Sequence, residues 1–414
     1  MLGYTFIREK RIVKMATNNR KKRRKKKGRK KIVLFIFEVL LLAVVLGVLW
    51  LYNSTFGKVT WENELSNSEA GINQDLDKDA AKKMHGYLNV ALFGLDNRSN
   101  GDYNTGHSDC IMIVSLNYDT NEVRLVSVYR DTYLSSGGGK FTKANFAYES
   151  GGAPNAVAML NSNLDLDITK YVSVDWKALV DAIDELDGID LEITEAERKE
   201  INFLLPEIDG TTGYRTGKVT DTGMVHLNGT QATAYARIRS TAGDDFLRAS
   251  RQRIVLEAMI NKMKETDIAT LTSMLSDIMG QVCTNFTQTE LISLATDLTE
   301  YNLVSTTGFP FELTTKTLSS TGDTVIPIDF SKNVTELHQY LFADDSYTPS
   351  NTVETLSSKI ANKTGVTSKT AAYDLTQYNE TVGADGTDAV KDTNKEKAEQ
   401  EKNSSSTTNK KEDE

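Results

Sequence analysis

One long apolar run, Ile32–Tyr52, constrains this chain more than any other feature. It contains 21 residues with a single charged side chain, Glu38. A helix of this length spans roughly 30 Å, which matches the hydrocarbon core of a bilayer. Glu38 lies toward the N-terminal end of the run, where a carboxylate costs less than at the midplane, and its apolar neighbours outweigh that cost. The run therefore predicts a transmembrane helix over residues 32–52.

A cleaved signal peptide is the competing interpretation of this run. Its apolar core would be only about 7–15 residues long and would precede a small-residue cleavage site. The run here is longer and ends in Leu49-Trp50-Leu51-Tyr52, without an Ala-x-Ala pattern. Trp50 and Tyr52 suit a membrane–water interface. We therefore expect an uncleaved anchor.

The distribution of charge predicts the orientation of this anchor. Residues 1–31 carry 15 Lys and Arg and one acidic residue, a net charge of +14, whereas the rest of the chain carries −23. The densest basic block, Arg20–Lys31, adjoins the apolar run, so the positive-inside rule explains it more simply than a nucleic-acid-binding tail does. We expect a cytoplasmic N-terminus, an extracellular C-terminal domain, anionic membrane lipids as partners and no nucleic acid. Met15 precedes this block, and the sequence leaves open whether Met1 or Met15 is the start.

Short apolar runs alternate with helical patterns from about His85 onward. Strands are predicted at 87–93, 110–117, 123–129, 171–174 and 189–193, and helices at 154–164, 176–186, 251–264, 271–279 and 290–301. A tight turn at 118–121 predicts a hairpin between the second and third strands. Residues 232–238 fit a strand or the start of a helix, and 305–330 is β-rich. This alternation, with at least one antiparallel pair, predicts a layered α/β domain.

The composition predicts five parts of the chain: a basic cytoplasmic tail (1–31), a transmembrane helix (32–52), a polar extracellular stalk (53–84), the α/β domain (85–345) and a disordered polar tail (346–414). The last part has little apolar periodicity to support a core. The two cysteines, Cys110 and Cys283, fit no CxxC spacing. We interpret both as small buried apolar residues, and one disulfide stays possible on an oxidising face of the membrane.

Charged side chains form four clusters, and the first three lie at the ends of predicted strands. The four clusters are Asp96-Asn97-Arg98, His107-Ser108-Asp109, Arg130-Asp131, and a group comprising Arg237, Arg239, Asp244, Asp245, Arg248, Arg251 and Gln252. Strand ends can aim such side chains into one cleft. Arginine offers a planar fork for phosphate oxygens, and carboxylates beside a phosphate need a hard cation such as Mg²⁺ between them. The clusters are compatible with a polyphosphate site, or with structural ion pairs such as Arg251 with Asp244 or Asp245.

Other familiar catalytic patterns are missing from the sequence. Gly137-Gly138-Gly139-Lys140 lacks the spacing of a phosphate-binding P-loop and fits a flexible loop. The four histidines show no metal-ligand spacing, no GxSxG element occurs, and neither cysteine has a clear activating partner.

Several separate motifs, in the right order, resemble the LytR-CpsA-Psr family. They are NVALFGLDNRSN, GHSDCIMIVSLNYDTNEVRLVSVYRDTYL, KANFAYESGG, HLNGTQATAYARIRS and GDDFLRASRQRIVL, between about Tyr87 and Lys264. The resemblance implies an α/β/α sandwich with a mixed central sheet, preceded by one transmembrane helix. It also implies a Mg²⁺-dependent transferase that attaches a polyprenyl-pyrophosphate-linked glycopolymer (teichoic acid, capsule or related) to peptidoglycan outside the membrane.

The resemblance further implies roles for individual residues. Asp96 and Asp109 would lie near Mg²⁺ and the reacting centre, one of them as general base, with Arg130 as a third catalytic residue. The donor would be bound by Arg98, His107, Arg237, Arg239, Arg248 and Gln252, while Asp131 and Asp245 would orient the arginines. His107 departs from the family, because many relatives have arginine there. A neutral imidazole supplies less positive charge, so we expect His107→Arg to keep or raise activity near neutral pH.

A polyprenyl chain would also need an apolar tunnel between the sheet and the helices. Side chains that could line it, although each also fits an ordinary core, are Met159, Leu160, Leu179, Ile183, Ile254 and Met259.

Three other functions fit parts of the sequence. A membrane-anchored transcriptional attenuator would need a nucleic-acid site, yet the one dense basic block adjoins the membrane. A non-catalytic binder of wall polymer or lipid pyrophosphate would not depend on Asp109. A pyrophosphatase would release lipid phosphate without a sugar acceptor, and only product analysis separates it from a transferase.

Overall fold

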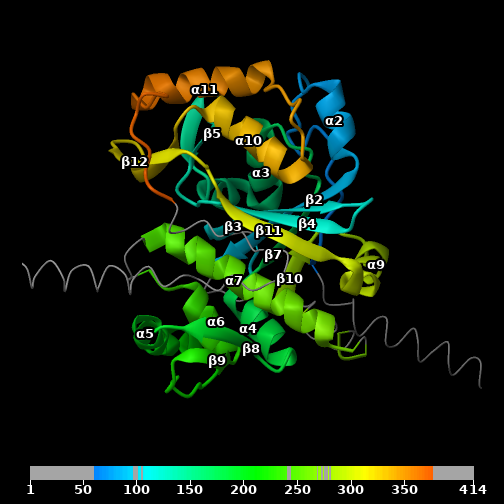
Figure 1. Cartoon of the computed structure of the whole chain (residues 1–414), viewed down its shortest axis with the longest axis vertical. Helices are drawn as coiled ribbons and strands as arrows, with labels where there is room; N and C mark the ends of the chain where they lie inside the picture. Colours follow the sequence, from blue (N-terminus) through cyan, green and yellow to red (C-terminus); the bar gives the residue numbers. More distant parts are fainter. Residues whose placement is uncertain are drawn as a thin grey trace, which may run out of the picture. The chain divides into compact units, whose positions relative to one another are not determined.

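The computed structural model describes residues 60–96, 101–103, 106–239, 244–267, 269–271, 274, 278 and 281–375 (Figure 1). The predicted basic tail, the predicted transmembrane helix 32–52 and residues 376–414 lie outside the described residues. Within the described part, no helix combines the length and apolarity that crossing a membrane requires.

A mixed seven-stranded sheet forms the centre of the domain. Its strands, in spatial order, are β1 (Thr60–Trp61), β10 (Val282–Thr284), β7 (Lys170–Val174), β2 (Tyr87–Leu95), β3 (Ser108–Asn117), β4 (Glu122–Val128) and β11 (Asn302–Phe309). β2 pairs in parallel with β7 and antiparallel with β3, β3 pairs antiparallel with β4, and β4 pairs in parallel with β11. The hairpin predicted between the strands at 110–117 and 123–129 is confirmed, since these strands are β3 and β4.

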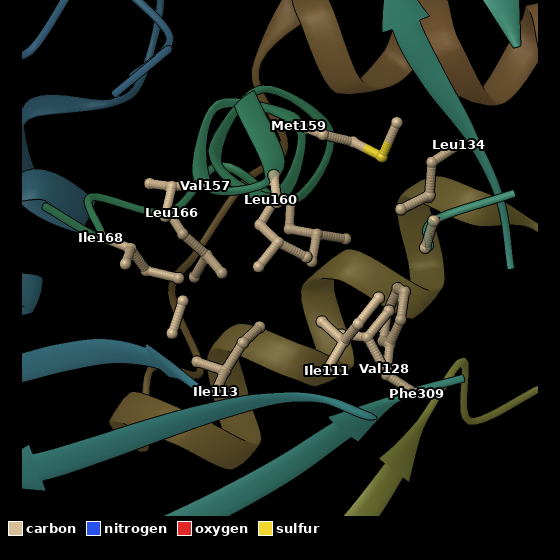
Figure 2. Close-up of a cluster of buried hydrophobic side chains, with 14 of the residues drawn as sticks. Ile111, Ile113, Val128, Leu134, Val157, Met159, Leu160, Leu166, Ile168 and Phe309 are labelled. Atoms are coloured by element: carbon tan, nitrogen blue, oxygen red, sulfur yellow. The ribbon is translucent and has the colours of Figure 1, made fainter. Parts of the chain in front are cut away.

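Helices cover both faces of this sheet, which confirms the predicted layered α/β architecture. On one face lie α2 (Lys78–Met84), α3 (Phe146–Leu164), α10 (Phe330–Phe342) and α11 (Asn351–Thr364). On the other lie α4 (Trp176–Glu185), α5 (Glu195–Thr212), α6 (Gly229–Ala236) and α7 (Asp244–Glu265). Figure 2 shows Ile111 and Ile113 of β3 pointing toward Leu160 of α3. Because side chains alternate along a strand, Cys110 and Met112 point to the opposite layer.

Smaller elements complete the domain. Three two-stranded sheets pair β5 (Tyr133–Gly137) with β6 (Lys140–Lys143), β8 (Ile189–Ile193) with β9 (Gly223–Leu227), and β12 (Leu313–Leu318) with β13 (Gly322–Pro327). The helix α9 (Gln288–Thr296) and the 3-10 turn η2 (Leu298–Glu300) precede β11. The β-rich stretch 305–330 therefore contributes to two sheets: β11 joins the central sheet, and β12 and β13 form a separate hairpin.

Local capping decides the segment that fitted either a strand or a helix. Residues 229–236 are helical because Asn228 caps α6, with its side chain accepting from the backbone N–H of Gln231. Gly229 allows close packing of α6 on α4, since a Cβ there would collide with the carbonyl group of Val180. The segment Arg237–Arg239 therefore follows the C-terminus of α6, and the packing of α6 on α4 fixes where this segment begins.

The structure corrects two predicted boundaries. Ala70 and Met84, in the predicted stalk, are fully buried in the core, and α2 packs beside β2. In the predicted disordered tail, residues 351–364 form α11, which buries Val353 and Ile360 against the layer of α3 and α10. In α11, Val353, Leu356 and Ile360 recur at helical spacing, but this signal is short. The burial of both segments depends on a core assembled from distant parts of the chain.

Candidate functional site

Four segments bring charged side chains to one edge of the central sheet. Asp109 lies near the start of β3, and Arg130 follows β4 directly. Arg239 follows α6, and Arg248 lies in the N-terminal part of α7. These residues belong to the four clusters that the sequence singled out, and the fold brings members of three of them into contact.

A β-bulge aims Asp109 into this site. Gly94 of β2 pairs with Cys110 of β3, whereas the next residue, Leu95, pairs with Ser108, so Asp109 is the extra residue. A bulge breaks the alternation of a strand and re-aims a side chain. Both Asp109 and its neighbour Cys110 consequently line the same cavity, although adjacent residues of a regular strand face opposite ways.

Three arginines surround the Asp109 carboxylate. Arg130 Nη1 donates to both of its oxygens at 2.9 Å. Arg239 Nη2 donates to Oδ2 at 2.6 Å, and Arg248 Nη1 lies 3.4 Å from the same oxygen. Only 15% of the Asp109 side chain is exposed. A carboxylate with three cationic neighbours can hold their guanidinium groups in one place while leaving other N–H donors available for an anion.

A second carboxylate, Asp245, links the same arginines from α7. Arg130 Nε and Nη2 lie 3.3 and 3.2 Å from its Oδ2, and Arg248 Nη2 lies 3.0 Å from its Oδ1. Asp131 contacts Arg130 at 3.6 Å and Lys143 at 3.0 Å. Arg130 is therefore oriented by three carboxylates. Lys143 is not among the predicted site residues. Its position beside the cluster is evident only from its ion pair with Asp131.

Burial and these ion pairs perturb the titration of the cluster. Burial favours the neutral form of Asp109, but Arg248 and Arg130 outweigh this effect and hold the pKa of its carboxyl below the usual range. The pKa of Asp245 is lowered in the same way, whereas burial raises the pKa of Asp131. Burial also lowers the pKa of Arg248 to about 10. At neutral pH Asp109 and Asp245 are ionised and Arg248 keeps its charge.

The remaining predicted residues occupy different positions around this cluster. Asp96, Arg237 and Gln252 line the cavity described below, together with Asp109 and Arg239. The Arg237 guanidinium lies 3.5 Å over the Trp176 ring and 3.3 Å from Glu207. Arg98 lies outside the described residues.

His107 and Arg251 make contacts of another kind. His107 Nδ1 is 3.4 Å from Glu149 of α3, and its ring meets Phe146 edge to face. Arg251 Nε donates to Glu197 of α5 at 2.9 Å and is almost fully buried. The Arg251–Glu197 pair joins α7 to α5, which is a structural role.

A cavity of about 320 Å³ extends from the charged cluster between the sheet and helices α4, α6 and α7. Its charged and polar lining includes Asp96, Asp109, Arg237, Arg239, Arg248 and Gln252. Its apolar lining includes Leu92, Met112, Val172, Leu179, Val255, Leu256 and Met259. Leu179 and Met259 are thus two of the residues that the sequence offered for an apolar tunnel. Met159 and Leu160, offered with them, pack on the opposite face of the sheet (Figure 2).

The carboxylates of the site can be compared with the ligands that Mg²⁺ prefers. Proteins usually bind Mg²⁺ through one or two carboxylates, with water and substrate phosphates as the other ligands. Asp96 and Asp109 line the same cavity, which fits this pattern. No group of three or more His, Cys, Asp or Glu side chains suited to a metal occurs in the described part of the chain.

An apolar cavity with a cluster of arginines and carboxylates at one end defines a protein suited to an amphiphile with a long apolar chain and an anionic head. The sequence comparison agrees with this class. Residues 55–333 match the model of the LytR_cpsA_psr family, and the chain belongs to this family.

Named relatives in this family are teichoic acid transferases. The chain is 31% identical over 251 residues to the polyisoprenyl-teichoic acid–peptidoglycan teichoic acid transferase TagU of Bacillus licheniformis, covering 59% of this chain and 76% of the relative. It is 29% identical over 268 residues to TagU of Bacillus subtilis, covering 63% and 81%.

Solved structures show the same fold. A structure described as TagT bound to LI-WTA has a TM-score of 0.52 at 23% identity and covers 68% of this chain and 100% of that one. A Streptococcus agalactiae protein has a TM-score of 0.51 at 23% identity, covering 66% and 94%.

Proposed function

We propose that this chain transfers a polyprenyl-pyrophosphate-linked glycopolymer onto peptidoglycan as a Mg²⁺-dependent enzyme. One observation carries the proposal: a single cavity joins an apolar interior to a cluster of arginines and carboxylates. The names of the TagU relatives support the same donor and acceptor.

In the proposed complex the prenyl chain lies in the apolar part of the cavity. Leu179 and Met259 would contact it, and burial of each methylene group contributes about 0.8 kcal/mol. The pyrophosphate would meet Arg239 and Arg237 at the charged end, and Gln252 can donate a further hydrogen bond. Apolar burial and charge therefore act on opposite ends of one ligand and fix its direction.

The proposed reaction joins an acceptor hydroxyl to the phosphorus next to the glycopolymer. The bond from this phosphorus to the bridging oxygen breaks, and the prenyl phosphate leaves. Arg130 and Arg248, held by Asp109 and Asp245, are placed to stabilise the charge that develops on the phosphate oxygens. A bound Mg²⁺ would add a positive charge at the pyrophosphate, with Asp96 and Asp109 as its protein ligands.

The two carboxylates suit different roles in this scheme. An effective general base needs a pKa near the working pH, and the arginines move the pKa of Asp109 in the opposite direction. Asp109 is therefore suited to positioning cations, which leaves Asp96 as the proposed acceptor of the hydroxyl proton.

The proposed enzyme is anchored by a transmembrane helix at 32–52, with residues 1–31 in the cytoplasm and the α/β domain outside the cell. The apolar run and the preceding +14 segment support this topology. The basic segment would contact anionic lipids, and we propose no nucleic-acid partner.

The test uses the full-length chain in detergent micelles, because α2 and α11 pack on the core and residues 85–345 alone would lack both. A synthetic polyprenyl-pyrophosphate disaccharide is supplied with peptidoglycan fragments, with Mg²⁺ or with EDTA. Wild-type protein should transfer the disaccharide only with Mg²⁺, and Asp109→Ala should abolish transfer. Asp190→Ala, at an exposed carboxylate of β8, is the matched control.

Three outcomes would overturn parts of this proposal. Tight donor binding without turnover would favour a non-catalytic binder. Release of prenyl phosphate without a glycosylated fragment would indicate a pyrophosphatase. Equal transfer in EDTA would exclude the proposed need for Mg²⁺.

A further inference from the structure

A second cavity, of about 490 Å³, lies against the central sheet. Its lining comprises Glu62, Gly101, Tyr103, Tyr148, Glu149, the α3 segment 150–154, Tyr171 and Cys283. Tyr171 precedes Val172 on β7, and Val172 lines the first cavity. Since neighbouring strand residues face opposite ways, the second cavity lies on the other face of the sheet.

A break in α3 opens the polar wall of this cavity. Gly151 (φ −173°, ψ 27°) and Gly152 (φ 66°, ψ −163°) leave the helical conformation, so backbone groups at the break lose regular helical partners. The positive φ of Gly152 requires glycine. Glu149 and Ser150, directly before the break, are exposed and add a carboxylate and a hydroxyl.

Tyrosines form the floor of the cavity. Tyr171 is fully buried, and within the described part of the chain its hydroxyl has no hydrogen-bond partner. Its neighbour Tyr148, also fully buried, donates to the carbonyl oxygen of Tyr103 at 3.2 Å. A buried hydroxyl without a partner is costly and is rarely retained without a reason. The Tyr171 hydroxyl, closed off from solvent, therefore keeps an unused donor beside the cavity.

Two contacts connect this cavity to the charged cluster. The N–H of Gly101, in its lining, donates to Asp175 Oδ2 at 2.9 Å, and Asp175 lines the first cavity. Glu149 lies 3.4 Å from His107, which precedes Asp109 by two residues. These contacts place the lining of the second cavity beside the edge of the sheet that carries Asp109, on the face opposite to the first cavity.

The charges of the two cavities differ. In the lining of the first, three arginines balance three carboxylates, whereas the described lining of the second includes Glu62 and Glu149 and no Lys or Arg. Carboxylates repel phosphate, but they accept hydrogen bonds from sugar hydroxyls and amides. A phosphorylated donor is directed to the first cavity, and an uncharged polyhydroxyl ligand fits the second.

We propose that the second cavity binds a sugar of the peptidoglycan acceptor and presents its hydroxyl to the charged cluster. This inference rests on the proposed transferase function, for which it supplies the acceptor subsite. Glu149 and the groups at the α3 break would accept and donate hydrogen bonds at the entrance, and Tyr171 would do so at the floor.

The test measures binding of a soluble disaccharide-peptide fragment of peptidoglycan to the full-length chain in micelles, by calorimetry and without donor. Glu149→Gln and Tyr171→Phe should each weaken this binding, Glu149→Gln by about ten-fold because a hydrogen bond to a charged group is lost. Both variants should bind inorganic pyrophosphate as the wild type does. Exposed residues provide the matched controls Glu192→Gln and Tyr118→Phe, and thermal unfolding confirms that each variant is folded.

Steady-state kinetics separates this inference from the proposed function. In the transfer assay Glu149→Gln should raise the KM for the acceptor fragment and leave the KM for the donor at its wild-type value. Unchanged acceptor KM and unchanged fragment affinity in both variants would overturn the subsite while leaving the transferase intact. If wild-type protein transfers nothing but the variants still lose fragment binding, the cavity is a glycan site and the proposed function fails.

Discussion

The Asp109 carboxylate binds the same guanidinium groups that a pyrophosphate would bind. Removing its charge should therefore change the affinity for pyrophosphate. Asp109→Asn keeps the shape of the side chain but removes one negative charge from the centre of three arginines. We expect this variant to bind inorganic pyrophosphate more tightly than the wild type in the absence of metal, although it should lose transfer activity.

The magnitude follows from the geometry. Arg130 and Arg239 donate to Asp109 at 2.9 and 2.6 Å. A phosphate on the far side of the same guanidinium would lie about 6 Å from the carboxylate. Two unit charges at about 6 Å repel by about 2.8 kcal/mol at an effective dielectric constant of about 20. Partial exposure and salt reduce this value, so we expect affinity to rise by about ten-fold.

The assay is calorimetric titration of full-length protein with inorganic pyrophosphate, in EDTA and then with Mg²⁺. Mg²⁺ should strengthen binding by the wild type more than by Asp109→Asn, because the variant lacks one proposed metal ligand. Weaker binding by the variant in EDTA would refute the reasoning, since Asp109 would then act by holding the arginines and not by competing with the phosphate.

Four further predictions follow from the same geometry. Arg248→Met should destabilise the domain by about 1.5–3 kcal/mol in urea unfolding, because Asp109 and Asp245 each lose one cationic partner while Arg130 still contacts both; a loss below about 1 kcal/mol would contradict this. Leu179→Trp should weaken binding of a long prenyl pyrophosphate about fifteen-fold if it displaces two methylene groups, with inorganic pyrophosphate unaffected; equal effects on both ligands would argue against the cavity. His107→Arg should keep or raise transfer activity near neutral pH, and complete loss would exclude a simple phosphate contact. The lowered pKa of Asp109 stabilises the fold above the usual carboxyl range and loses this contribution as pH falls through the folded value; Asp109→Asn should therefore flatten the acid limb of a stability profile, and an unchanged limb would refute the assignment.

Much of the fold could be predicted because its signals are local. The apolar runs of β3 and β4, with a tight turn between them, predict a hairpin without the rest of the chain. The helical spacing from Trp176 to Leu186 identifies α4, which Asp175 caps. Such patterns depend on residues within one or two turns, so they are readable without the rest of the chain.

The boundaries of the domain could not be predicted in this way. α11 and the segment around Ala70 have few apolar residues, and their burial depends on a core contributed by residues far away in the sequence. Composition alone classified both segments as polar.

The candidate site was predicted in its residue types and only partly in its arrangement. The strand-end positions of Asp109 and Arg130 indicated a shared cleft, and the two are paired. The part played by Lys143 was not readable, because its partner Asp131 is reached only through the folding of β6 back on β5.

Neighbouring residues are enough to specify the apolar run 32–52, the alternating elements and the family motifs, and all three are readable from the chain before it folds. Which carboxylate holds which arginine is a property of the folded domain, because these pairs join residues up to 139 positions apart. The same is true of the bulge that turns Asp109 toward the cavity, and of Tyr171 and Val172, which line cavities on opposite faces of the sheet. Register between strands and packing between layers set these directions, and neither is encoded within any one segment.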